Sequence, residues 1–482
     1  VKSSISLKSL IYKDFSLVNL DVSTKSLEIK NLISFLKFFK NDTKLFFAEK
    51  LIKNGYIIAN ISLEFNKKGN IKDNYKINGF VKNGNIDILK KYNLVEIDFN
   101  FELDKKEISL NDIEVSINDK DVFFPVISII KDTKNFLISG KINNKEILLD
   151  KEAISDLIDF KISDLSLKKV KFASETLFNF SIDKRLKFEN LKVNSKIDLV
   201  NLELSNNLNL KHIFPKIKKD INIQNHEISL IYDKENLSID GFGDLLLQDE
   251  LDKINYKIIQ NKKEIKFDAK YKILNNELKI DFLNYEKKKK SNLEITFKGN
   301  KIFNGNLFFK KLLFNEKNNY LDVTDLLITK ENEIDSFNKI DLDYLDKDNL
   351  TNKIRILKSN EAYTLKGDSF NINKIIENSL ENNDKKKFLF KNKFSLNIDI
   401  KKTYLDELNV INDLKGYLIL LDNDIYDANL EAKFDNNDKI TLTVKKNDDA
   451  KITTLFSGQA KPLVKRYKFI KGFDEGSLDF YS

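Results

Sequence analysis

The chain has 482 residues, of which 41% are hydrophobic and 32% are charged, and its formal net charge is +8. It contains no Cys, Met or Trp, so disulfides and thiolate metal sites are excluded. Almost all the basic residues are Lys, without the Arg-rich clusters or modules typical of nucleic-acid binding. No stretch approaches the roughly 20 apolar residues of a membrane-spanning helix. Since the sequence begins at Val1 and lacks Met, we expect a segment of a longer or processed protein.

Apolar and polar residues alternate along much of the chain. Period-two alternation puts the apolar side chains of a strand on one face of a sheet. A first group of strands is predicted over 55–65, 75–81, 94–103 and 113–117. Further strands are expected over 226–232, 254–258, 265–273, 277–283, 292–298 and 305–314. The fold class predicted from this pattern is mainly β: an elongated, curved antiparallel sheet that forms a hydrophobic groove, with a few short helices.

Short helices and turns interrupt the alternation. Helices are predicted over 32–47, 151–160, 208–221, 373–380 and 462–470. Asn83-Gly84, Lys68-Gly69-Asn70 and Asn304-Gly305 are predicted tight turns, and the basic run 287–290 is predicted to be a solvated hairpin turn. We divide the chain into an N-terminal part of the sheet (1–205), a middle part (206–360) and a C-terminal region (361–482).

No arrangement of residues indicates catalysis, a cofactor or a metal. His212 and His226 lack metal-ligand spacing and are predicted to be loop or surface residues. The pair Gly241 and Gly243 lacks the third glycine of a dinucleotide fingerprint, so a turn or a strand kink is predicted there. Aspartates cluster without the glycine and glutamate of a calcium loop, and solvated turns are favoured; they are Asp341, Asp343, Asp346, Asp348, Asp422, Asp424 and Asp427. We therefore predict that the protein is not an enzyme.

The apolar face of the sheet is the remaining candidate for function. If two such faces close on each other, they form an ordinary sandwich core. If one face stays uncovered, it must hold acyl chains or a partner, because exposed apolar surface costs about 25 cal/mol per Å². The candidate residues that line such a groove are Ile97, Phe99, Phe101, Ile265, Phe267, Ile295, Phe297, Ile398 and Leu430.

The C-terminal region carries a more specific pattern. An alternating strand at 394–400 is followed by the apolar run 414–421 around Gly416 and by strands at 428–434 and 440–444. A short apolar and basic helix at 462–470 then leads to the sequence Gly476-Ser-Leu-Asp-Phe480. This order resembles the C-terminal region of AsmA-like envelope proteins of the YhdP and TamB type, in which a strand-rich domain of unknown function precedes it. The run 77–89 and the strand at 95–103 resemble the strand-rich middle of that family.

The resemblance implies a protein in the envelope of a bacterium with two membranes. It implies a periplasmic location, with an inner-membrane anchor outside this segment, and a β-groove that conducts phospholipids towards the outer membrane. Its partners would be phospholipid acyl chains and unidentified inner- and outer-membrane proteins at the ends of the groove, but no nucleic acid. The alternative is a structural envelope scaffold or adhesin, built of closed β-sandwiches without a lipid cargo.

Overall fold

The computed structural model describes residues 1–7, 12, 15–39, 52–88, 92–117, 120–132, 135–151, 165–183, 187–206, 210–288, 290–380, 393–421, 424–446, 450–467 and 475–482. The chain divides into two compact units. Unit 1 contains Val1–Ile158, Lys169–Asn201 and Asn225–Ile239, and unit 2 contains Asp159–Lys168, Leu202–Gln224 and Asp240–Ser482. In the described residues, 28 strands belong to one sheet and two short strands form a second one.

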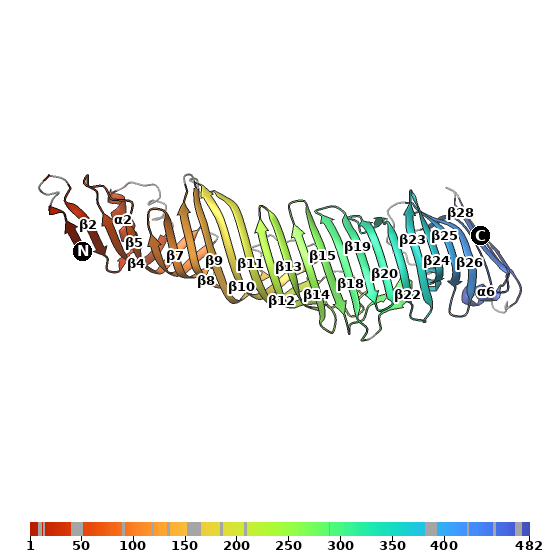
Figure 1. Cartoon of the computed structure of the whole chain (residues 1–482). Coiled ribbons are helices and arrows are strands. Elements are labelled where there is room, and N and C mark those ends of the chain that lie inside the picture. The colour runs from red at the N-terminus through yellow and green to blue at the C-terminus, as the bar shows by residue number, and fades with distance from the viewer. Residues whose placement is uncertain are drawn as a thin grey trace. The chain divides into compact units, whose positions relative to one another are not determined.

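Unit 1 is built from strands that follow one another in chain order, as Figure 1 shows for β4 to β9. Helix α2 (Ile29–Phe39) packs against β4. The strands are β1 (Lys2–Ile5), β2 (Leu17–Ser23), β3 (Leu27–Glu28), β4 (Ile52–Glu64), β5 (Lys76–Ile88), β6 (Tyr92–Leu103), β7 (Glu107–Ile117), β8 (Lys120–Lys131) and β9 (Asn135–Asp150). Four further strands have residues in both units: β10 (Leu165–Asp183), β11 (Phe188–Asn206), β12 (Asp220–Asp233) and β13 (Asn236–Leu246).

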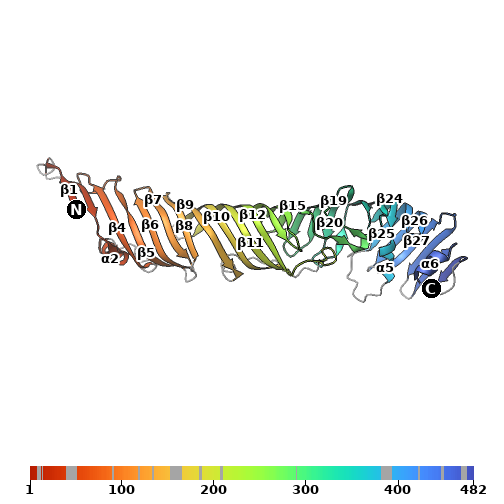
Figure 2. The ribbon, with the colours of Figure 1, turned by 90° about the horizontal axis from the view of Figure 1, so that it is seen from below.

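Unit 2 continues with shorter strands and carries two short helices, α5 (Asn373–Leu380) and α6 (Lys461–Tyr467), beside its last strands (Figure 2). The strands are β14 (Asp252–Gln260), β15 (Glu264–Ile273), β16 (Lys279–Ile280), β17 (Tyr285–Glu286), β18 (Leu293–Ile302), β19 (Leu307–Glu316), β20 (Asn319–Ile328), β21 (Ile334–Ser336), β22 (Lys339–Leu345), β23 (Thr351–Ser359), β24 (Ala362–Asn371), β25 (Phe394–Tyr404), β26 (Val410–Leu421), β27 (Asp424–Lys433), β28 (Lys439–Lys446), β29 (Lys451–Ser457) and β30 (Leu478–Tyr481). A 3-10 turn, η1 (Asp281–Leu283), joins β16 and β17.

The described strand pairs are antiparallel, with one exception, which lies in unit 2. Strands β24 and β25 are parallel, with Leu365 opposite Ile398. A parallel pair needs a connection that crosses from one end of the strands to the other. The chain between them, residues 372–393, begins with α5. The prediction of a mainly β protein with an open antiparallel sheet and a few short helices is confirmed.

Several local predictions are confirmed and others are wrong. The helices predicted over 373–380 and 462–470 correspond to α5 and α6, and the helix predicted over 32–47 overlaps α2. Three parts of these predictions lie outside the described residues: residues 40–47 of the helix predicted over 32–47, residues 152–160 of the helix predicted over 151–160, and residues 468–470. The helix predicted over 208–221 is wrong, because residues 210–217 form turns and β12 begins at Asp220. Pro215 explains this, since proline inside a helix removes a hydrogen bond and clashes with the preceding turn.

Two predictions failed where the backbone departs from regular strand geometry. The strand predicted over 277–283 is wrong, because this segment forms β16 and η1. The tight turn predicted at Asn83-Gly84 is also wrong. Both residues lie inside β5, where Asn83 has a φ of 52° and the pairing with β6 shifts register. An extra residue in a strand produces such a bulge without ending the strand.

Some predicted surface residues are buried. Lys287, in the basic run 287–290, is 3% exposed, and His226 on β12 is 1% exposed, whereas His212 lies exposed in a turn. Asp341 lies in β22 and Asp346 just after it, at 9% and 3% exposed, so neither is in a solvated turn. Gly241 and Gly243 lie in β13, and a Cβ on Gly241 would be 2.6 Å from the ring of Tyr256. The glycine therefore makes room for a ring from the next strand.

Candidate functional site

The apolar face of unit 1 carries a row of side chains that are in register across eight strands. Each member lies opposite the next on the neighbouring strand, so all of them project from the same face. All eight are half-buried, neither exposed nor closed off. The row is Val22, Ile61, Ile77, Leu103, Ile108, Ile129, Ile138 and Phe180, on β2 and on β4 to β10. We call it the unit 1 row.

Unit 2 carries a longer row of the same kind across fourteen strands. No member is charged or polar at its tip, apart from the Tyr256 hydroxyl, whose pKa burial raises to about 12. Three members are buried, one is exposed and the others are half-buried. This unit 2 row is Tyr256, Ala269, Phe297, Leu312, Val323, Ile340, Ile356, Leu365, Ile398, Gly416, Leu430, Leu442, Leu455 and Phe480.

The nine predicted groove residues all lie on these apolar faces. Phe297, Ile398 and Leu430 belong to the unit 2 row, and Ile265 and Phe267 share the face of Ala269 on β15. The ring of Phe267 lies 6.1 Å from that of Phe297 and 5.6 Å from that of Phe309.

The other predicted residues differ in how far they are covered. Phe99 and Phe101 are half-buried on β6 with their rings 6.3 Å apart. Ile97 and Ile295 are each 6% exposed and pack inside the cores of their units.

Core packing differs between the units. In unit 1, the cluster of described buried side chains contains only Ile97, Ile113 and Val115, with half-buried neighbours around it. In unit 2, the cluster includes Ile273, Leu278, Leu293 and Ile400, all at most 2% exposed, among many others. Leu278 comes from residues 274–292 between β15 and β18, which we call the cover segment. This segment places apolar side chains on one side of the unit 2 face.

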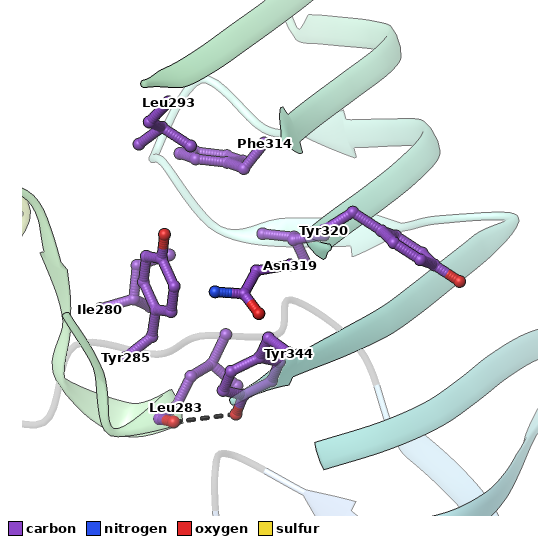
Figure 3. Close-up of a pocket in the computed structure, with 9 residues that line it drawn as sticks. Ile280, Leu283, Tyr285, Leu293, Phe314, Asn319, Tyr320 and Tyr344 are labelled. Carbon is purple, nitrogen blue, oxygen red and sulfur yellow. Dashed lines mark hydrogen bonds between the residues drawn. The ribbon is translucent and has the colours of Figure 1, made fainter. Parts of the chain in front are cut away.

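Figure 3 shows the contact between the cover segment and the sheet. Leu283 and Tyr285 from the cover segment face Leu293 and Phe314 from the sheet around a small pocket that is lined mainly by apolar side chains. The Tyr344 hydroxyl donates a 2.8 Å hydrogen bond to the Leu283 carbonyl, and the ring of Tyr344 packs edge-on against that of Tyr285. Helix α5 also contacts η1. The cover segment is therefore held from several directions.

Hydrogen bonds of buried polar groups hold both ends of the cover segment in place. At its start, Tyr271 and Asn276 donate hydrogen bonds of 2.6 and 2.7 Å to Asp252, which is 2% exposed. At its end, the Lys287 ammonium donates a 2.6 Å hydrogen bond to the Leu274 carbonyl. Burial raises the pKa of the Asp252 carboxyl and lowers the pKa of Lys287, since both lose hydration.

A second buried carboxylate holds the second half of the cover segment. Tyr285 donates a 2.7 Å hydrogen bond to Glu316, which is 2% exposed on β19, and the Lys288 backbone N–H donates to the same carboxylate at 3.3 Å. Removing one partner of a buried charged group is costly, because the other is left unsatisfied. This part of the face is therefore covered by a fixed element.

The opposite face of the sheet is charged. Lys298 and Asp268 form a 2.9 Å ion pair on neighbouring strands, and Lys401 and Asp368 form a 2.8 Å pair. These pairs are largely exposed and contribute little to stability. One face is thus solvated, and the other is an apolar surface for which water is a poor solvent.

The arrangement offers binding by apolar contact. The described residues contain no group of acidic or histidine side chains that could hold a metal ion. Alternation in the sequence located single strands of the face but did not reveal the cover segment. It also did not identify Ile340, Ile356 or Leu365, whose strands lacked a predicted alternation, although the runs KIDLDYL and NKIRIL do alternate weakly.

No helix among the described residues is both long enough and apolar enough to span a membrane. No family model, curated protein or solved structure matched this chain in the comparisons with known proteins.

Proposed function

We propose that the protein holds lipid acyl chains on its apolar face and conducts phospholipids between the inner and outer membranes of a bacterial envelope. The observation that carries the proposal is the pair of in-register apolar rows, which remain largely half-buried across successive strands. Each Å² of apolar surface taken out of water contributes about 25 cal/mol, so acyl chains laid along such rows would be bound favourably. The side chains are aliphatic residues and Phe, which match hydrocarbon without requiring hydrogen bonds.

The cellular setting is part of the same proposal. The resemblance of residues 394–480 to AsmA-like proteins supports a periplasmic location, an anchor in the inner membrane outside this segment, and a role in outer-membrane homeostasis. Partner proteins of the inner and outer membranes would dock at the two ends of the lipid path. No chemistry is assigned to the protein itself, since movement along a smooth apolar face needs no covalent step.

The first test is mass spectrometry of organic extracts from protein purified without detergent. We expect co-purified phospholipid at one or more molecules per chain. The variants Phe99→Asp and Phe267→Asp place a carboxylate on the face and should lower that lipid content strongly. The matched controls Asn100→Asp and Lys266→Asp put the same group on the exposed face of the same strands and should leave it unchanged. Equal lipid content in all four variants would contradict the proposal.

The second candidate function is a structural scaffold or adhesin without lipid. The dry core of unit 2 under the cover segment is the observation that favours it, because packed apolar side chains there need no ligand. A lipid-free, folded and monodisperse protein in the extraction experiment would favour this candidate. The closed sandwiches expected for it would require paired sheets, whereas 28 described strands share one sheet.

A further inference from the structure

One hairpin turn of unit 2 exposes two consecutive apolar side chains. The turn joins β18 to β19, and Ile302 and Phe303 at its start are 50% and 42% exposed. Single exposed apolar side chains are normal on a protein surface and need no explanation. Among the turns that join paired strands in the described residues, this is the only one with two consecutive large apolar residues exposed. The pair is therefore a candidate contact surface for another molecule.

The neighbouring turn, between β14 and β15, adds positive charge beside this pair. Lys262 and Lys263 are exposed there. The Phe303 backbone N–H donates a 3.1 Å hydrogen bond to the Lys263 carbonyl, so the two turns lie side by side. The adjacent carboxylate of Glu264 is half-buried and accepts a 2.8 Å hydrogen bond from Asn300. We call the two turns, residues 261–264 and 302–306, the paired tip.

Hydrogen bonds inside the paired tip satisfy much of its backbone. The Ile302 N–H donates to the Asn306 carbonyl at 3.2 Å, and the Gly305 N–H donates to the Ile302 carbonyl at 3.0 Å. The Lys301 ammonium donates a 3.0 Å hydrogen bond to the Gly305 carbonyl. Backbone polar groups that leave water for a lipid environment must find their partners within the protein. The paired tip meets this requirement at these groups before any membrane is present.

The size and charge of the paired tip favour a membrane surface over a protein as the partner. A stable protein interface buries about 800 Å² on each partner, which is far more than two hairpin turns can offer. Segments that bind membrane surfaces place apolar side chains at the boundary between headgroups and acyl chains. Their lysines are attracted to anionic headgroups. Ile302 and Phe303 supply the first feature, and Lys262 and Lys263 supply the second.

We propose that the paired tip docks unit 2 onto the surface of a membrane that contains anionic phospholipids. Ile302 and Phe303 enter the headgroup boundary, while Lys262 and Lys263 lie at the level of the phosphates. The inference goes beyond the proposed function, because the paired tip contacts an intact bilayer and none of its residues belongs to the unit 2 row. Docking therefore does not require the protein to carry lipid.

A single tryptophan tests the docking, because the chain contains no native Trp. Phe303→Trp is mixed with vesicles made of equal parts of dioleoylphosphatidylcholine and dioleoylphosphatidylglycerol. We expect its emission to shift to the blue and to be quenched by brominated phosphatidylcholine in the same vesicles. The matched control is Leu408→Trp, in the turn between β25 and β26, where Leu408 is 85% exposed next to Glu407. Its emission should not change.

The role of the lysines is measured in the Phe303→Trp background. Each lysine near an anionic surface strengthens binding about fivefold, so Lys262→Gln together with Lys263→Gln should weaken vesicle binding about 25-fold. Lys366→Gln removes an exposed charge from β24 and should have no effect. Added salt should weaken the binding of Phe303→Trp, because it screens exposed charges. Equal binding to vesicles of pure dioleoylphosphatidylcholine would overturn the proposed anionic surface.

Two further results decide the inference separately from the proposed function. Ile302→Trp is a second reporter in case Phe303→Trp does not fold, and an unchanged emission of the folded reporter with anionic vesicles would overturn the docking. A shift of Leu408→Trp as large as that of Phe303→Trp would also overturn it. Lipid that co-purifies with the protein reports the proposed function alone, so docking without co-purified lipid would support the paired tip and contradict lipid conduction.

Discussion

The apolar faces of units 1 and 2 differ in cover although their strands have the same alternating pattern. In unit 1, the eight members of the row from Val22 to Phe180 are all half-buried. In unit 2, Ala269, Val323 and Leu365 of the row are buried, and the core cluster beside the row is far larger than that of unit 1, with Ile354 and Ile400 at 4% and 2% exposed. The difference comes from elements inserted between strands, such as the cover segment and α5. The alternation of apolar and polar residues therefore determines which side chains share a face of the sheet. The segments that connect the strands determine how much of that face is buried.

The largest expected difference between the units is the response to a buried charge. Ile400→Asp puts a carboxyl into the closed core of unit 2 and should reduce the free energy of unfolding by at least about 4 kcal/mol. Ile138→Asp puts the same group on the half-buried row of unit 1 and should cost about 1–2 kcal/mol. Urea unfolding followed by circular dichroism measures both. Equal losses would mean that the two faces are equally closed.

A smaller effect is expected from the cover segment itself. Leu278→Ala removes a side chain of the cover segment that is fully buried in the core of unit 2, and it should destabilise unit 2 by about 2–5 kcal/mol. Phe282→Ala, in the same segment but 56% exposed, should change stability by less than about 0.5 kcal/mol. Thermal unfolding of the two variants gives the comparison. A large loss for Phe282→Ala would show that the segment is fastened differently.

The smallest effect concerns the pH dependence of the anchor at Asp252. Its pKa is raised by burial, so the folded protein binds this proton more readily than the unfolded chain. The stability that protonation provides is complete below the unfolded pKa and is lost as the pH rises through the folded pKa. Asp252→Asn cannot titrate, so wild-type stability relative to this variant should fall as the pH increases from acid to neutral. Each unit of pKa shift corresponds to about 1.4 kcal/mol.

The measurement for this third comparison is the difference in urea midpoint between wild type and Asp252→Asn across acid and neutral pH. Taking the difference removes the titration of all other groups. A Tyr271→Phe variant serves as a control for the hydrogen bond without the charge. A difference that is constant with pH would contradict the raised pKa, and one that changes in the opposite direction would indicate that the hydrogen bonds outweigh burial.

Much of the sheet could be predicted from sequence, because alternation is a local property. The strand of residues 94–103 was identified within two residues of β6, and 265–273 within one of β15. The segment 277–283 was misread because Leu278, Ile280 and Phe282 alternate like a strand. There the chain instead turns through η1 and Asn284, which adopts a left-handed conformation. Seven residues are too few for periodicity to distinguish the two.

The candidate face depends on information that a single sequence does not carry. Register across strands is set partly by bulges, such as the shift near Asn83, and one added residue would turn every later side chain to the other face. Burial of Lys287 could not be expected from a run of four lysines, since its partners are backbone carbonyls brought in by the fold. The residues of single strands were therefore predictable, while their alignment into rows was not.

The parallel pair β24–β25 has a consequence for how the chain reaches its native state. Antiparallel neighbours joined by short turns form from contacts that are close in sequence, and such contacts form quickly. The parallel β24–β25 pair can form only after the connection of residues 372–393 brings the two strands together. Closing this longer loop has a higher entropic cost than closing a short turn. The antiparallel hairpins before β24 and after β25 can form first, and the pairing of β24 with β25 is then the slow step. Refolding of unit 2 should thus show two kinetic phases, with the slower one sensitive to the length of the connection that contains α5.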